Sequence, residues 1–110
     1  MKTINFTYNW NNKLDCKAFT TFRLRNPAKY KIGESYQILL KGKVVGTATI
    51  VQILPLTLDK VNEWIARLDT GYSLPEFKKL VETMYKNKVN VRMADFSLLL
   101  LHKEKEETHG

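Results

Sequence analysis

The chain has 110 residues, which fits one domain, because a single hydrophobic core usually occupies about 100–150 residues. Its 44% hydrophobic and 26% charged residues are ordinary globular values, which excludes a disordered, a collagen-like and a coiled-coil chain. Eighteen Lys and Arg against eleven Asp and Glu give a formal net charge of +7.

The excess positive charge lies in the first half of the chain. Residues 1–50 carry nine Lys and Arg and two Asp and Glu, a net +7, whereas residues 51–110 carry nine of each. A one-sided positive field raises the local concentration of anionic partners, so this pattern favours a phosphate-bearing ligand. The alternative is a solubilising surface whose asymmetry has no function.

Cysteine content and hydropathy indicate the compartment. Cys16 is the single cysteine, so no intramolecular disulfide can form, and a reducing, cytoplasmic location is expected. The apolar run Leu98–Leu101 is far shorter than the roughly 20 residues that span a bilayer. The first residues contain no apolar segment typical of a secretory signal, so we expect no membrane segment and no signal peptide.

The first half of the chain predicts strands. Apolar and polar residues alternate over residues 3–10, which is typical of a half-buried strand, and a turn follows at residues 11–13. Further strands are expected over residues 16–25, 36–40 and 44–53. Lys41-Gly42 predicts the hairpin turn between the last two, and Gly46 predicts a bulge.

The second half changes to helical spacing. The first predicted helix has Val61, Trp64, Ile65 and Leu68 as its buried stripe, because these apolar residues recur every three or four positions. Thr57 or Asp59 is expected to cap its start. Residues 69–72 are expected to form a loop. A capping box then starts a second helix, formed by Ser73, Pro75 and Glu76.

The buried stripe expected for this second helix is Phe77, Leu80, Val81 and Met84. A last strand is predicted over residues 93–101, either buried on both sides or at an edge, and residues 103–110 are expected to fray. The sequence thus predicts an α+β domain spanning residues 1–110. Five or six strands would form a mixed or antiparallel sheet curled into a small barrel or half-barrel, with two helices.

The predicted strand over residues 16–25 has two different faces. Even positions are mostly apolar or small and are expected to face the core, which makes Cys16 a buried hydrophobe. Odd positions are Lys17, Phe19, Thr21, Arg23 and Arg25. Cations beside a hydroxyl and an aromatic ring are suited to a phosphate and a stacked base, although a solvated strand face gives the same pattern.

Four segments of the chain together resemble the ASCH domain family of the PUA-like superfamily. They are Lys17 with Thr20-Thr21-Phe22-Arg23, the turn Tyr30-Lys31-Ile32-Gly33-Glu34, the strand 43–50, and the acidic segment 68–77 that leads into a capped helix. The family typically has a Gly-x-Lys-x-x-Thr-x-Arg stretch and an aromatic-Lys-x-Gly-Asp/Glu turn. The resemblance covers residues 14–102.

This resemblance implies a PUA-like barrel whose cleft binds RNA, a nucleotide or a nucleoside. Some small members of the family are amidohydrolases that remove the acyl group of N4-acetylcytidine with a lysine, a threonine and a glutamate. Transferred to this chain, Lys17 matches the lysine, Thr20 or Thr21 the threonine, and Asp69 the acid. Arg23 matches the arginine.

The chain departs from the family pattern around the lysine. Asp15-Cys16 precedes Lys17 where the family has a glycine, and one extra residue separates Lys17 from Arg23. Counting from Lys17 selects Thr20, whereas counting back from the Tyr-Lys-x-Gly turn selects Thr21. The acid is Asp69 rather than glutamate, which shortens its reach by one methylene.

Three functions follow as expectations. The first is an RNA- or nucleotide-binding domain that uses Lys17, Phe19, Arg23, Arg25 and Tyr72, without a cofactor. The second is an amidohydrolase in which a lysine of lowered pKa activates a threonine and Asp69 passes a proton to the leaving amine. The third is a protein-interaction adaptor whose basic half binds an acidic partner.

The remaining candidates have simpler interpretations. His102 and His109 have no Cys or acidic partners at metal-ligand spacing, so no metal site is expected. Trp64 is expected in the core. Tyr72 can stack on a base or form the hydrophobic staple of the second helix.

Overall fold

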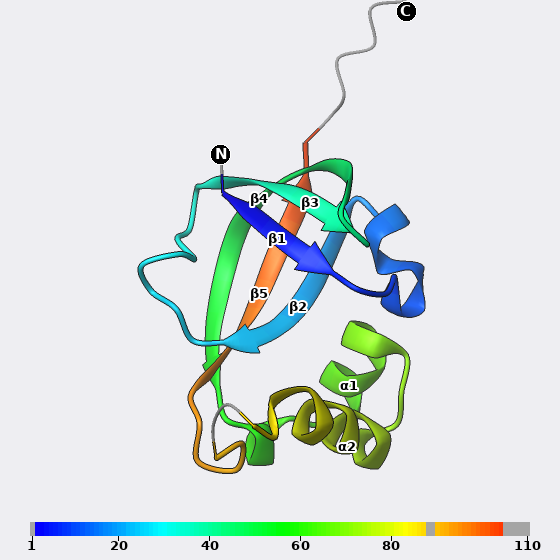
Figure 1. Ribbon diagram of the computed structural model, residues 1–110, viewed down its shortest axis with the longest axis vertical. Coiled ribbons are helices and arrows are strands. Elements are labelled where there is room, and N and C mark those ends of the chain that lie inside the picture. The colour runs from blue at the N-terminus through cyan, green and yellow to red at the C-terminus, as the bar shows by residue number, and fades with distance from the viewer. Residues whose placement is uncertain (1, 88–89, 105–110) are drawn as a thin grey trace, which may run out of the picture.

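The computed structural model describes residues 2–87 and 90–104. It is an α+β fold in which five strands form a mixed sheet, curled into a half-barrel, with two helices below one end of it (Figure 1). The strands are β1 (Thr3–Phe6), β2 (Ala18–Leu24), β3 (Ser35–Leu40), β4 (Lys43–Leu56) and β5 (Phe96–Lys103). The helices are α1 (Glu63–Thr70) and α2 (Leu74–Tyr85), and two short 3-10 segments are η1 (Trp10–Asp15) and η2 (Leu58–Lys60). None of the helices in the described ranges has the length and apolar character needed to cross a lipid bilayer.

The strand order is β1-β3-β4-β5-β2, so β1 and β2 are the two edges of the sheet. β1 runs parallel to β3, and the other neighbours are antiparallel. Curling brings the two edges together across a seam that side chains close. Arg23 Nη2 donates to the carbonyl oxygen of Asn5 at 2.7 Å, and the rings of Phe6 and Phe19 meet edge to face at 6.1 Å.

Several predicted strand features are confirmed. Lys41 and Gly42 form the β3–β4 turn with positive φ angles of 52° and 82°. The pairing of β3 with β4 shifts between Ile38 and Leu39, so Val45 has no partner in β3 and forms a bulge. Val45 lies next to Gly46, where the bulge was expected. The leucine run lies in β5, between β4 and β2, so it is an interior strand and not an edge.

Two buried clusters stabilise the fold. One fills the concave side of the half-barrel; its members are Ile4, Phe6, Leu14, Phe19, Tyr30, Tyr36, Ile38, Ala48, Ile50, Leu99 and Leu101. The other joins the lower end of the sheet to the helices; its members are Phe22, Leu58, Val61, Ala66, Phe77, Val81, Val91 and Phe96. Phe22 stacks on Phe96 at 4.5 Å and meets Phe77 edge to face, so these rings connect the two layers.

The first strand is shorter than predicted. β1 ends at Phe6, and the chain turns into η1, whose residues Asn11 and Asn12 have left-handed φ angles of 56° and 53°. Asparagine tolerates this conformation better than most residues. The backbone N–H of Leu14 donates to the Asn9 side chain at 2.9 Å, so a local turn replaces the alternating pattern that had predicted a continuous strand.

The predicted cap of α1 is wrong, and its predicted stripe is confirmed only at Val61, which is buried, and Ile65, which packs against the second buried cluster. Asn62 caps this helix by accepting a hydrogen bond from the Ile65 N–H at 2.9 Å, whereas Thr57 and Asp59 flank the separate segment η2. Because the helix begins at Glu63, the buried face runs through Ala66, Asp69 and Thr70. Trp64 and Leu68 are therefore 77% and 63% exposed rather than buried.

The capping box of α2 is confirmed. The Ser73 hydroxyl accepts from the Glu76 N–H, and the Glu76 carboxylate accepts from the Ser73 N–H. The expected stripe is confirmed at Phe77 and Val81, which are buried, whereas Met84 is 51% exposed.

Replacing Ser73 with Ala removes one partner of this box. We expect Ser73→Ala to lower the free energy of unfolding by about 1 kcal/mol, which corresponds to roughly 4 °C in Tm for a domain of this size. The control is Thr83→Ala on the exposed face of the same helix, where about 0.5 kcal/mol or less is expected. Thermal and urea unfolding measure both; equal losses in the two variants would contradict the role of the cap.

Candidate functional site

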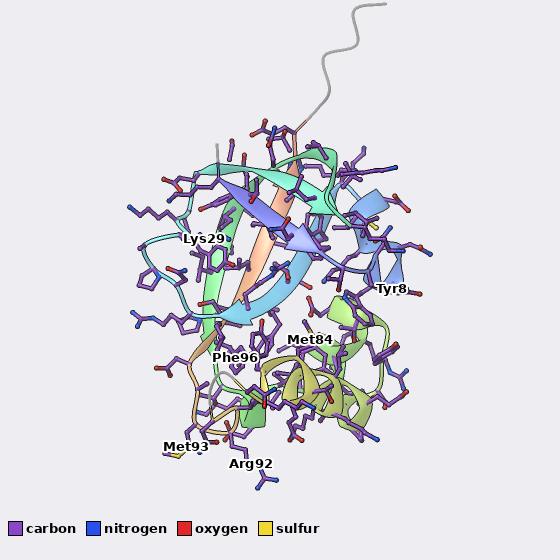
Figure 2. All side chains as sticks on the ribbon, viewed as in Figure 1. Tyr8, Lys29, Met84, Arg92, Met93 and Phe96 are labelled. Atoms are coloured by element: carbon purple, nitrogen blue, oxygen red, sulfur yellow. The ribbon has the colours of Figure 1, made fainter. Side chains whose placement is uncertain are left out.

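A cleft opens between the seam of the half-barrel and the two helices. Its enclosed volume is about 110 Å³. Its walls come from β1 and β2 on one side, from η1 and the end of α1 on another, and from α2 below. Figure 2 shows Met84, one of the lining residues, on the side of α2 that faces the sheet.

A buried ion pair lies in the wall of this cleft. Lys13 Nζ and Asp69 Oδ1 are 3.0 Å apart, and each side chain is only 6% exposed. The Thr20 hydroxyl donates to the same Asp69 oxygen at 2.9 Å. Asp69 therefore joins η1, β2 and α1 through a single carboxylate oxygen.

The local sequence explains how Lys13 reaches Asp69. Asn11 and Asn12 turn the chain in the left-handed conformation, and the Asn11 side chain donates to the Arg67 carbonyl at 3.4 Å. Gly71 ends α1 with a φ of +81°, and a Cβ there would lie 3.4 Å from Asn11. A glycine at this position thus permits both the left-handed end of the helix and the close approach of η1.

The surroundings of Lys13 lower the pKa of its amine. Burial lowers the pKa of the Lys13 amine, and nearby Arg23 lowers it further, while Asp69 opposes both effects. Burial is the largest of these influences, so the net pKa lies below its ordinary value. The Phe6 ring, whose centroid is 5.4 Å from Lys13 Nζ, gives limited compensation to the charged form.

Arg23 and Thr21 form a second polar group in the cleft. Arg23 Nε donates to the Thr21 hydroxyl oxygen at 3.0 Å, and its guanidinium lies over the Phe6 ring at 4.7 Å. Among the residues that the structure describes, no partner is recorded for Nη1. Thr21 is buried, lines the cleft, and uses its oxygen as an acceptor, which leaves its own proton for a ligand.

Lys17 does not lie where the resemblance predicted. It is exposed and lines a different hollow, together with Cys16 and His102, near the β3–β4 turn. The lysine beside Asp69 is Lys13, four positions earlier. Asp69 itself lies in the last turn of α1 and not in a loop.

The two threonines point to different surroundings. Thr20 bonds Asp69 but is not among the residues that line the cleft, whereas Thr21 lines it.

Two other residues at odd positions of β2 and its end were expected to meet a ligand, but neither lines the cleft. Phe19 is buried within the sheet, and Arg25 is exposed beyond the end of β2 beside Met93. Cys16 is exposed, so its predicted burial is wrong. Both faces of the middle of β2 are covered, whereas the sequence predicted one face toward the core and one toward a ligand.

Tyr72 belongs to a group of three touching aromatic rings. Its ring centroid is 5.5 Å from that of Trp10, which in turn is 4.7 Å from that of Tyr8. Trp10 also lines the cleft. Figure 2 shows Tyr8 at the margin of the molecule, beside η1 and above α1.

Sequence reasoning missed Lys13 and Trp10. Both were assigned to a strand or its turn, because nothing local marks a 3-10 segment that brings a lysine to a distant carboxylate. Two departures from the pattern of the resemblance lie around Lys17, namely the missing glycine before it and the extra residue before Arg23.

Comparison with known proteins provides no assignment. A scan against family models finds no match, and searches of curated proteins and of solved structures find none either. Within residues 2–87 and 90–104, no group of three or more His, Cys, Asp and Glu side chains could hold a metal ion. His109 lies outside these residues.

The lowered pKa of Lys13 predicts how stability depends on pH. Between that lowered pKa and the value of about 10.4 in the unfolded chain, the unfolded state binds more protons, so stability rises with pH. We expect the unfolding free energy of the wild type, relative to Lys13→Met/Asp69→Asn, to increase from pH 7 toward pH 10. Urea unfolding at several pH values measures this difference, and a flat or falling curve would contradict the burial argument.

Proposed function

We propose that the cleft hydrolyses the amide bond of an N-acylated pyrimidine nucleoside, of which N4-acetylcytidine is the simplest example. The observation that carries the proposal is the buried Lys13–Asp69 pair, in which burial lowers the pKa of the lysine. Titratable groups with a shifted pKa in a cleft are typical of catalytic sites. A lowered pKa makes the unprotonated amine of a lysine more accessible, and that form can accept a proton from a nucleophile.

The size of the cleft supports a substrate with one ring. Its enclosed volume of about 110 Å³ is somewhat smaller than the cavity of roughly 150 Å³ that accommodates benzene in another protein. A space of this size leaves no room for a base and its ribose together, so the ribose would remain at the mouth. The Phe6 and Phe22 side chains supply apolar walls for the ring.

In the proposed reaction, Thr21 Oγ1 attacks the acyl carbonyl carbon and its proton passes to the neutral Lys13 amine. The C–N bond breaks, Lys13 returns the proton to the leaving nitrogen, and the acyl group remains as an ester on Thr21. Water, deprotonated by Lys13, then cleaves this ester and releases the carboxylic acid. Arg23 is available to stabilise the negative oxygen that develops in each step.

Asp69 and Thr20 act as positioning residues in this proposal. Asp69 holds the Lys13 amine at 3.0 Å, and the Thr20 hydroxyl holds Asp69 at 2.9 Å. The combination of lysine, threonine and acid agrees with the chemistry that the ASCH resemblance implies, with Lys13 in place of Lys17. Lys17 and Arg25, the expected phosphate contacts, do not line the cleft, which favours a base over a phosphate as the group bound inside it.

The two lysines provide a matched test of the proposal. We expect Lys13→Ala to reduce acetate release from N4-acetylcytidine by at least about 100-fold, the lower range for loss of a general base. Lys17→Ala should retain the wild-type rate, because Lys17 lines another hollow. No release by the wild type above the Lys13→Ala level would refute the activity.

The two adjacent threonines provide a second test. We expect Thr21→Val to abolish turnover, since it removes the nucleophile but keeps the shape of the side chain. Thr20→Val should lower kcat by a smaller factor and shift its pH profile, because Asp69 then loses one of its two donors. The opposite order of effects would show that Thr20 is the reacting hydroxyl. Circular dichroism of both variants verifies that they are folded.

A further inference from the structure

We propose that Tyr8, Trp10 and Tyr72 form a stacking strip for the base that neighbours the one in the cleft, so the natural ligand is single-stranded nucleic acid rather than a free nucleoside. This inference rests on the proposed function, because it concerns the same cleft. It concerns three residues that the proposed chemistry does not use.

The three rings form a continuous surface. Tyr8 and Trp10 are tilted at 4.7 Å between ring centroids, and Trp10 and Tyr72 meet edge to face at 5.5 Å. They come from the segment between β1 and η1, from η1 itself and from the segment after α1, so the tertiary fold assembles the strip. Neither buried cluster includes any of them.

Two of the rings remain accessible to a ligand. Tyr8 is 55% and Tyr72 38% exposed, and each presents an aromatic surface to solvent. Large aromatic rings gathered at one exposed place often mark a binding surface. Rings of this kind bind successive bases of a single strand by stacking, with little regard to base identity.

The aromatic strip is continuous with the cleft, which indicates that one ligand lies on both. Trp10 lines the cleft and touches both tyrosines, so the strip starts at the wall of the cleft and leads away from it. Because the cleft has room for no more than about one ring, the rest of a longer ligand must leave it, and Trp10 is one of the residues in its wall. A second base of the same strand would then lie over the exposed tyrosines.

The charge distribution agrees with a polyanionic strand. The chain carries a formal net charge of +7, so the field around the whole molecule is positive. This field attracts a phosphate backbone before any specific contact forms. A free nucleoside, which is uncharged, gains nothing from it.

The binding test uses the fact that the chain has two tryptophans. In Trp64→Phe, Trp10 is the remaining tryptophan, and titration with single-stranded hexacytidylate should quench its fluorescence. Trp10→Phe, which keeps the exposed Trp64, serves as the control and should show little quenching. Absence of quenching in Trp64→Phe, or equal quenching in both variants, would overturn the inference.

The activity test compares two substrates, free N4-acetylcytidine and an RNA hexanucleotide that contains one N4-acetylcytidine. For Tyr8→Leu, the ratio of kcat/KM for the hexanucleotide to that for the nucleoside should fall about tenfold, through loss of one stacked base. Trp64→Leu, the matched exposed aromatic at the start of α1, should leave the ratio unchanged. Equal ratios in the two variants would overturn the stacking strip.

The two tests separate the two proposals. If the wild type hydrolyses neither substrate but Trp10 is quenched and Tyr8→Leu weakens hexacytidylate binding, the hydrolase proposal fails and the strip is supported. If the nucleoside is hydrolysed without any quenching by hexacytidylate, the strip fails and the hydrolase proposal stands.

Discussion

The ion pair between Lys13 and Asp69 is the interaction on which the candidate site depends. It connects η1 with the last turn of α1, and the Thr20 hydroxyl extends the connection to β2. Removing two charges from water is costly, and an apolar pair of similar size is often at least as stable. A small domain that keeps a buried lysine in a cleft therefore carries a feature that stability alone does not require.

The incomplete closure of the sheet creates the space in which this pair lies. β1 and β2 approach each other as unpaired edges, and the seam between them is closed by Arg23 and by the contact of Phe6 with Phe19. The cleft thus forms where the half-barrel stays open, and the residues that close its seam also supply its polar wall.

Sequence patterns were sufficient where local chemistry determines the structure. The alternation in β3, the Lys41-Gly42 turn and the capping box at Ser73 each depend on neighbouring residues, and each is confirmed. Contacts between residues far apart in the sequence could not be predicted in this way. The position of Lys13 depends on two left-handed asparagines and on the approach of η1 to Gly71, 60 positions later in the chain, and no periodicity reports such a contact.

The burial of some side chains also differs from the prediction. Trp64 fits a helical stripe, yet the helix starts at Glu63 and turns another face to the core. β2 was expected to have one core face and one ligand face, but both faces are covered near Phe19 and Phe22. The resemblance placed Asp69 near the threonines of β2, and Thr20 does donate a hydrogen bond to Asp69.

The most direct measurement is the titration of the Lys13 side chain by nuclear magnetic resonance, with its signals assigned by their absence in Lys13→Met. The account predicts a midpoint below the value of about 10.4 for an unperturbed lysine, because desolvation outweighs the attraction of Asp69. A midpoint at or above that value would show that Lys13 stays charged as the partner of Asp69, which contradicts its proposed role as the base of the cleft.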